Sequence, residues 1–314
     1  MFIQKNFLLI IVGLSVVFAI AMKATIYQNT VSAPVAGGQP SADFSAYWHT
    51  GKAELNRYTL QQAQYGALNP GEAVLVFVTE DFRTDTQVKA ETDEAKGRAT
   101  NVLKLNSIKK FVTGIYDYSV YTSVFTPIDR KQYPNTLKIS TSVQEWCGHT
   151  YLQLNYRSSG FQVSGRSYFE NEVAEDYRIN KALLEDELWT LIRLSPDKLP
   201  VGAIKLIPGT QSARLRHKVL SVLDATATLA DYNGTDFPGS GLKAYTLNYQ
   251  EDGRQLTIIY EKAFPHRIVG WEETYMSRNK PLTSRAVLQK TIQTDYWNHN
   301  APADTVLRQP LGVQ

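Results

Sequence analysis

The chain has 314 residues, with 33 Lys and Arg against 30 Asp and Glu, a formal net charge of +3, and one cysteine. Its scattered, nearly balanced charges exclude an extended basic surface for nucleic acid. A single cysteine excludes an internal disulfide, so an apolar core must hold together one large or two modest domains.

The chain begins as a secretory signal does. Lys5 lies in a short basic start, residues 7–22 form an apolar run, and Ala19-Ile20-Ala21 is a small-x-small cleavage sequence. Residues 1–22 are therefore predicted to be a signal peptide. An uncleaved signal anchor is the alternative, because the run is short of the roughly 20 apolar residues that span a bilayer comfortably. We expect an exported protein, either periplasmic or anchored to the inner membrane facing the periplasm.

Composition changes divide the rest of the chain. Small residues with prolines and glycines predict a flexible spacer after the signal, and two prolines near Asp197–Gly202 predict a joint between two folded regions. The predicted division is 23–42 spacer, 43–195 N-terminal β-rich region, 203–300 C-terminal antiparallel β meander, and 301–314 tail.

The first strands follow from periodicity. Ala73–Val78 is a continuous apolar run between polar residues, which is typical of a buried strand. Thr113–Phe125 alternates aromatic and small polar residues, which predicts a half-exposed strand.

Two hairpins are predicted further along the chain. The first joins Tyr151–Tyr156 to Phe161–Phe169 across a polar turn that ends in a glycine. The second joins Ala244–Tyr249 to Gln255–Tyr260 across Asp252-Gly253, where glycine supplies the positive φ of a tight turn. Two further segments, 265–275 and 284–296, are expected to continue this meander.

One helix is predicted among the strands, over residues 181–194. Asn180 is a suitable N-cap, and Leu184, Leu188, Leu191 and Ile192 share one face. The acidic run of residues 185–187 is expected to face solvent. The predicted fold class is mainly β, with large curved antiparallel sheets forming an open half-barrel and one or two packed helices.

Five segments carry a family resemblance: Trp48–Leu55, Ala73–Phe82, Gly114–Tyr118, Gln144–His149 and Ser167–Glu170. Together they resemble an uncharacterised group of exported proteins, common in Bacteroidetes-type bacteria, and the likeness covers most of residues 43–297. Members are often labelled septum formation inhibitor Maf. Maf enzymes are cytoplasmic nucleotide pyrophosphatases with an N-terminal Ser-x-Ser-Pro-Arg-Arg loop. This chain lacks that loop, so the resemblance implies export and not that activity.

The C-terminal region carries a second, looser resemblance. Tyr-x-Leu-x-Tyr, a turn and Leu-x-Ile-x-Tyr are followed by Phe264–Ile268 and Trp271-Glu272. This order is similar to the meander of secreted DUF3108-type and lipoprotein-carrier-like proteins. The resemblance implies one antiparallel sheet curled into an open half-barrel whose concave face can hold an acyl chain.

The segment Glu145-Trp146-Cys147-Gly148-His149 is the candidate site for chemistry. If residues 141–154 form one strand, Glu145, Cys147 and His149 project from the same face. A carboxylate, a thiol and an imidazole side by side can activate a nucleophile or bind a metal. The favoured interpretation is structural: Cys147 is a small buried residue, Trp146 packs on the other face, and His149 lies at a bend near Gly148.

An acidic set is the other candidate for a cation site. It comprises Glu170, Glu172, Glu175 and Asp176, and it lacks the spacing and central glycine of a calcium loop. A solvated turn is the favoured interpretation. We therefore expect no metal, no cofactor and no nucleic-acid partner.

Two classes of function follow, with a third left open. The favoured one is a non-catalytic cell-envelope protein that binds a lipid, another hydrophobic ligand or an envelope component on a curved β-sheet. It predicts an apolar concave face without converging titratable groups. The alternative is an envelope enzyme that uses Cys147 and His149 as nucleophile and base. A structural or scaffolding role is the third.

Overall fold

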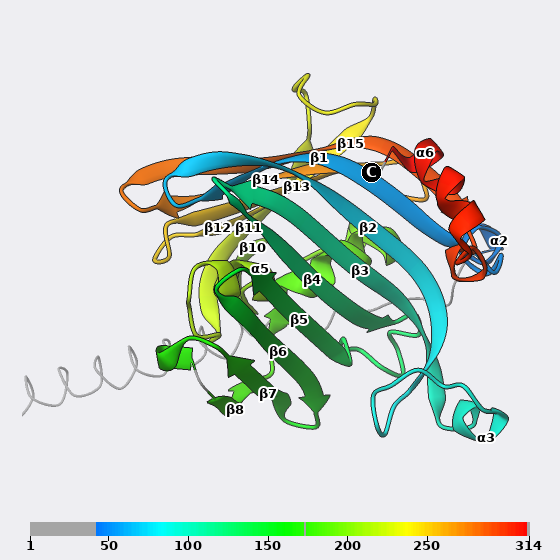
Figure 1. The fold of residues 1–314 in the computed structure, drawn as a ribbon. Helices are drawn as coiled ribbons and strands as arrows, with labels where there is room; N and C mark the ends of the chain where they lie inside the picture. Colours follow the sequence, from blue (N-terminus) through cyan, green and yellow to red (C-terminus); the bar gives the residue numbers. More distant parts are fainter. Residues whose placement is uncertain (1–41, 173, 313–314) are drawn as a thin grey trace, which may run out of the picture.

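The computed structural model describes residues 42–172 and 174–312, and its main feature is one sheet of 15 strands. The spatial order is β8-β7-β6-β5-β4-β3-β2-β1-β15-β14-β13-β12-β11-β10-β9, so that β1 and β15 join the two halves of the chain (Figure 1). The strands are β1 Ala53–Gln64, β2 Ala67–Arg83, β3 Ala99–Thr113, β4 Tyr116–Pro127, β5 Lys138–Glu145, β6 Gly148–Arg157, β7 Gly160–Ser167, β8 Ala174–Asn180, β9 Leu183–Leu184, β10 Gly202–Ile207, β11 Leu223–Asp231, β12 Leu242–Tyr249, β13 Arg254–Glu261, β14 Ile268–Ser277 and β15 Lys280–Thr294.

Helices are few and short in the described part of the chain. They are α2 Ala42–Trp48, α3 Asp93–Lys96, α4 Glu185–Leu194, α5 Thr210–Leu215 and α6 Arg308–Leu311. Short 3₁₀ helices are η1 Glu170–Glu172, η2 Pro196–Lys198, η3 Tyr296–Asn298 and η4 Pro302–Leu307. Among the described residues, no helix is long and apolar enough to cross a membrane.

The sheet is antiparallel, apart from the short β9–β10 pair, and it is strongly curved. Register shifts at Arg57/Tyr58 and Ile259/Tyr260 interrupt two of its ladders, and such bulges bend a strand and increase its twist. The sheet stays open, with β8 and β9 as its two edges (Figure 1). The predicted class, mainly β with a large curved antiparallel sheet and packed helices, is confirmed.

The hairpins form where the turn residues predicted them. β6 and β7 flank Ser158-Ser159, and Gly160 follows at φ +153°. β12 and β13 flank a turn in which Gly253 has φ +61°. Residues 113–125 are not one strand, because Gly114, at φ +67°, turns the chain between β3 and β4. Glycine adopts these left-handed conformations without the strain that a Cβ atom adds.

Two helices, α4 and α5, pack against the concave face of the sheet. Leu188, Leu191 and Ile192 of α4 and Ala213 of α5 belong to the same buried cluster as inward-facing residues of many strands. α4 begins near the end of the sheet that holds the β1–β2 turn and runs toward the opposite end, where Arg193 reaches Glu54. The helices therefore fill the hollow of the half-barrel.

Two predictions about α4 are wrong. The helix begins at Glu185 rather than Lys181, because Asn180 ends β8 and Leu183–Leu184 pair with β10. The acidic residues of its first turn, Glu185, Asp186 and Glu187, are buried rather than facing solvent. Each has a partner from another part of the chain, and such pairing permits the burial of a carboxylate.

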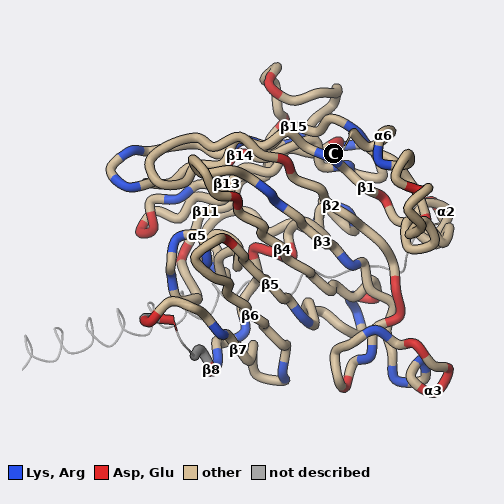
Figure 2. Tube along the Cα trace, viewed as in Figure 1, with Lys and Arg blue, Asp and Glu red and all other residues tan. Residues whose placement is uncertain are grey.

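The charges that remain on the surface are mixed. Figure 2 shows Lys and Arg interspersed with Asp and Glu over the whole described chain, without an extended basic stripe. The predicted signal, 1–22, and nearly all of the predicted spacer lie outside the described residues.

Candidate functional site

The predicted candidates Glu145, Cys147 and His149 lie around the tight turn between β5 and β6. Trp146 and Cys147 form the turn itself, Glu145 pairs with Gly148, and Gln144 pairs with His149. Residues 141–154 are therefore a hairpin and not one strand, so the three side chains do not share a face as predicted. The predicted burial of Cys147 is also wrong: its side chain is exposed, and Trp146 is 69% exposed.

The surroundings of Cys147 do not activate its thiol. Its backbone N–H donates to Oε2 of Glu145 at 2.7 Å. A hydrogen bond to the Glu145 carboxylate, and then the negative charge of that group, raise the pKa of the Cys147 thiol. A catalytic thiol requires the opposite shift, since the thiolate is the nucleophile. In the described part of the chain no hydrogen bond joins Cys147 to His149, and no three His, Cys, Asp or Glu residues lie close enough to hold a metal ion.

Replacing Glu145 with glutamine should therefore make Cys147 more reactive. The neutral amide removes the negative charge that disfavours the thiolate, so the rate of alkylation by iodoacetamide at neutral pH should rise. The same change at exposed Glu170, in the next turn, is the matched control and should leave the rate unchanged. Equal rates for wild type and Glu145→Gln would show that Glu145 does not control the thiol.

The predicted acidic set is not a solvated turn throughout. Glu172 is only 8% exposed. Its Oε2 accepts from Arg214 at 3.1 Å, and its Oε1 lies 2.9 Å from Nδ1 of His217. Asp176 is exposed and pairs with Arg166 at 2.9 Å. Glu172 therefore fixes the end of α5 to the connection between β7 and β8.

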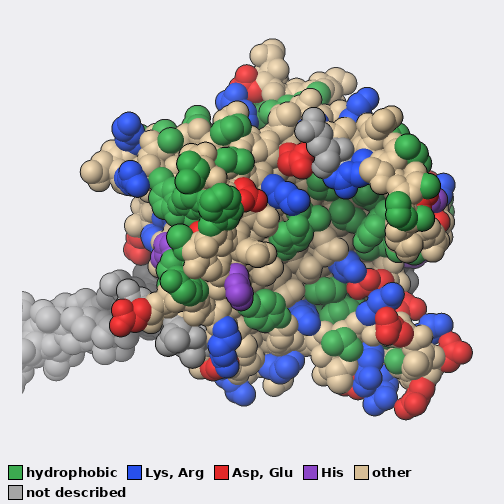
Figure 3. All heavy atoms as spheres, in the orientation of Figure 1, with side chains coloured by type: hydrophobic (Ala, Val, Ile, Leu, Met, Phe, Trp, Pro, Cys, Tyr) green, Lys and Arg blue, Asp and Glu red, His purple; other side chains and the backbone are tan. Residues whose placement is uncertain are grey.

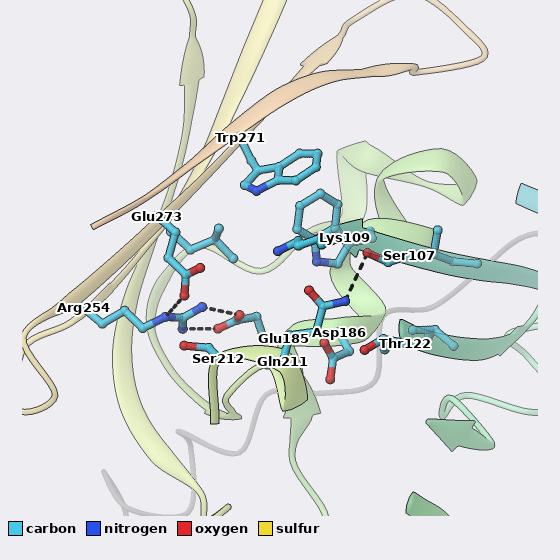
Figure 4. Close-up of a pocket in the computed structure, with 15 residues that line it drawn as sticks. Ser107, Lys109, Thr122, Glu185, Asp186, Gln211, Ser212, Arg254, Trp271 and Glu273 are labelled. Carbon is cyan, nitrogen blue, oxygen red and sulfur yellow. Dashed lines mark hydrogen bonds and ion pairs between the residues drawn. The ribbon is translucent and has the colours of Figure 1, made fainter. Parts of the chain in front are cut away.

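A buried ionic network, which the sequence did not predict, lies between the sheet and the helices (Figure 4). The guanidinium of Arg254 on β13 donates to both carboxylate oxygens of Glu185 on α4, at 2.6 Å each, and to Glu273 on β14 at 2.6 Å. The hydroxyl of Tyr249 also donates to Glu185. These hydrogen bonds satisfy the buried charges and join the first turn of α4 to three strands.

Lys109 on β3 points into the cavity beside this network. Its ammonium lies 5.3 Å from the ring centre of Trp271, and no hydrogen bond or ion pair of the described residues involves it. Burial lowers the pKa of Lys109. The cavity has a volume of about 40 Å³. That volume accommodates water but is well below that of an ordinary ligand site.

Asp186 connects the two helices. Its Oδ2 accepts from the backbone N–H of Thr210 at 2.9 Å and from the Thr210 hydroxyl at 2.8 Å. The carboxylate therefore satisfies a free N–H at the start of α5. Burial raises the pKa of Asp186 to about 6, and the hydrogen bonds from Thr210 offset only part of that effect.

A larger cavity lies on the other side of α5. Its volume is about 380 Å³, within the range of small-molecule sites. Its apolar wall comprises Pro208, Ala213, Val219, Leu220, Leu223 and Tyr249. Its polar edge contains Arg216 and Lys218, which both pair with Asp252 in the β12–β13 turn. The cavity therefore has an apolar body and a charged margin.

Sequence reasoning missed both cavities for the same reason. The smaller cavity is lined by strands and helices that are distant in the chain, and the larger one by residues 208–224 together with residues at the β12–β13 turn. Neither lining forms a short motif. The only local signal was an acidic run at residues 185–187 beside a leucine-rich helical face, and we interpreted that run as solvent-facing.

The comparisons with known proteins leave the assignment to the geometry. No family model matches the chain, and neither the curated proteins nor the solved structures contain a match.

Proposed function

We propose that this protein is a non-catalytic, exported cell-envelope protein that binds a hydrophobic ligand, such as a lipid, beside the concave face of its sheet. The observation that carries the proposal is the cavity of about 380 Å³ between α5 and the strands β11 and β12. An apolar ligand gains free energy from burial against its aliphatic wall, and Arg216 and Lys218 at the margin suit a polar end group.

The cover of this cavity is short. α5 has six residues, and the segment that follows it carries Val219, which is 66% exposed. Ion pairs of Arg214 with Glu172, and of Arg216 with Asp252, hold the helix at both sides. All six residues of α5 are buried, so the exposed segment after α5, rather than the helix itself, is the part of the cover that can move to admit a ligand larger than the cavity.

The predicted absence of converging titratable groups is wrong, since Arg254, Glu185 and Glu273 meet in the core. These groups bind one another at short distances and leave room only for water beside them. We therefore regard them as a support for α4. The alternative enzyme is disfavoured because Cys147 has a raised pKa and lies away from both cavities.

The proposal is tested by native mass spectrometry of the full chain purified from an exporting host, with organic extraction of what co-purifies. We expect a stoichiometric apolar adduct. Val219→Asp places a charge on the apolar wall and should abolish the adduct. Val201→Asp is the matched control, because Val201 is also exposed, at 60%, and does not line the cavity.

Two results would contradict the proposal. One is a protein without an apolar adduct that also fails to take up added fatty acid or phospholipid. The other is an adduct that survives Val219→Asp as well as it survives Val201→Asp, since the ligand would then lie elsewhere.

A further inference from the structure

One end of the sheet carries exposed apolar side chains at successive turns. We define the turn rim as Leu68, Ile115, Trp146, Tyr168 and Met276, which are 47%, 82%, 69%, 66% and 54% exposed, respectively. Ile115, Trp146 and Tyr168 lie in the β3–β4, β5–β6 and β7–β8 connections. Leu68 and Met276 lie at the ends of β2 and β14, beside the β1–β2 and β14–β15 turns. Large apolar side chains that are exposed close to one another mark a surface that binds another protein, a ligand or a membrane.

The topology requires these turns to lie together. Alternate connections of an antiparallel sheet fall at the same end, and the pairing of β1 with β15 brings the β14–β15 turn beside the β1–β2 turn. Two contacts confirm the proximity of neighbouring turns. Arg278 lies 5.6 Å from the ring centre of Tyr65, and Nε1 of Trp146 donates to Asp117 at 2.8 Å. Figure 3 shows hydrophobic side chains gathered at this end, on the left of the view.

The opposite end of the sheet has a different character. The β2–β3 connection contains α3, and its charged residues Asp93, Glu94, Lys96 and Arg98 pair with one another in solvent. Exposed apolar side chains also occur at this end, among them Val88 at 45%, Trp297 at 43% and Tyr296 at 40%, each less exposed than any residue of the turn rim.

The composition of the turn rim favours a lipid bilayer as the occupant. Its side chains stand on separate turns and do not line a groove, so each can enter a soft surface on its own. Trp and Tyr are the residues enriched at the bilayer interface, and Arg278 and Lys280 flank the rim where long basic side chains can reach lipid headgroups. Asp117 accepts from Nε1 of Trp146, and Glu145 accepts from the backbone N–H of Cys147, beside Trp146.

The position of the larger cavity supports the same occupant. The β12–β13 turn, with Asp252, and the segment carrying Val219 lie at the rim end of the sheet and border the cavity of about 380 Å³. A ligand leaving a bilayer at the rim would therefore meet this cavity first. This step rests on the proposed function, whereas the exposure and composition of the rim do not.

We propose that the turn rim docks onto the interface of a lipid bilayer, with Ile115, Trp146 and Tyr168 entering the headgroup region. The only cysteine of the chain lies next to Trp146 and is exposed, so an environment-sensitive dye can be attached to the rim without a substitution. The apolar residues 7–22 can bind vesicles by themselves, so bulk sedimentation cannot test the proposal and a local probe is needed.

The experiment attaches a nitrobenzoxadiazole dye to Cys147 in the full chain and adds vesicles of phosphatidylethanolamine and phosphatidylglycerol. We expect the emission to shift to shorter wavelength and nitroxide-labelled lipid to quench it. The same dye on Glu94→Cys in a Cys147→Ser background, at the opposite end, should show neither change. Ile115→Ser with Tyr168→Ser should abolish the shift at Cys147, whereas Val88→Ser, an exposed valine of the β2–β3 connection, should not.

An unchanged emission at Cys147 in the presence of vesicles would overturn the proposal, and a partner protein would then be the better candidate for the rim. Equal quenching at positions 147 and 94 would also overturn it. Neither fluorescence measurement depends on a bound ligand. Membrane docking can therefore fail while the ligand adduct is present, and docking can be observed when no adduct is found.

Discussion

Replacing Arg193 with alanine is expected to lower the free energy of unfolding by about 3–5 kcal/mol, the range for removing one partner of a buried ion pair. Arg193 is fully buried at the end of α4, and its guanidinium donates to both oxygens of Glu54 on β1, at 2.6 and 2.7 Å. It also lies 4.9 Å and 4.6 Å from the ring centres of Trp48 and Phe77. Urea unfolding monitored by circular dichroism measures the change.

The loss of stability arises mainly from the Glu54 carboxylate, which stays buried without its partner. Burial, the largest single influence, would raise the pKa of Glu54, but the charge of Arg193 together with the hydrogen bonds from Arg193, Tyr47 and Asn56 holds the pKa below its usual value. Without Arg193, Glu54 becomes a buried charge with only Tyr47 and Asn56 as hydrogen-bond donors. The pair Arg193→Met with Glu54→Gln should recover much of the loss, because no uncompensated charge then remains.

A matched surface pair provides the control. Arg285 and Glu272 lie 2.5 Å apart, and their side chains are 43% and 30% exposed. Arg285→Ala should change the free energy of unfolding by about 0–1 kcal/mol, as is usual for exposed pairs. If Arg193→Ala costs no more than Arg285→Ala, the buried pair does not fix α4 to the sheet.

The sequence predicted the sheet well because its signals are local. Alternating side chains in β4 and the glycine turns at Gly160 and Gly253 act within a few residues of themselves, and they determine strands and hairpins. The curvature of the sheet was expected only from a resemblance. Its bulges, at Arg57/Tyr58 and Ile259/Tyr260, depend on pairing between strands and leave no mark in one segment.

The interior could not be predicted in the same way. Nothing near Glu185 in the sequence indicates Arg254, its partner 69 residues away, and nothing near Asp186 indicates Thr210. An acidic residue in an isolated helical pattern is most simply solvated, and it is buried only when a distant donor approaches. The prediction that Cys147 is buried on a strand was wrong for a local reason. Gln144 pairs with His149, so the residues between them form a turn.

Replacing Asp186 with asparagine is expected to stabilise the protein at neutral pH by about 3 kcal/mol, since its pKa of about 6 lies roughly two units above that of an unfolded aspartate. A carboxyl group whose pKa is raised by folding stabilises the native state while it is protonated. Its contribution is complete below about pH 4 and is lost as the pH rises through about 6. Asparagine keeps an oxygen that can accept from Thr210 and carries no charge at any pH.

The measurement is the free energy of unfolding of both proteins in urea between pH 4 and 8. The two curves should separate as the pH rises, with the wild type losing stability relative to Asp186→Asn. Glu185, Arg254 and Lys109 face the same carboxylate and are present in both proteins, so the difference reports the titration of Asp186 together with its electrostatic coupling to these groups.

A second variant identifies the cause of the pH dependence. Thr210→Val retains the charge of Asp186 but removes the hydroxyl that donates to the carboxylate. The pKa of Asp186 should rise further, so the loss of stability should be larger and extend to higher pH. Parallel curves for wild type and Asp186→Asn would instead mean that Asp186 titrates as it does in the unfolded chain. The contact between α4 and α5 would then be open to water, and α5 would be a looser cover of the ligand cavity than its hydrogen bonds indicate.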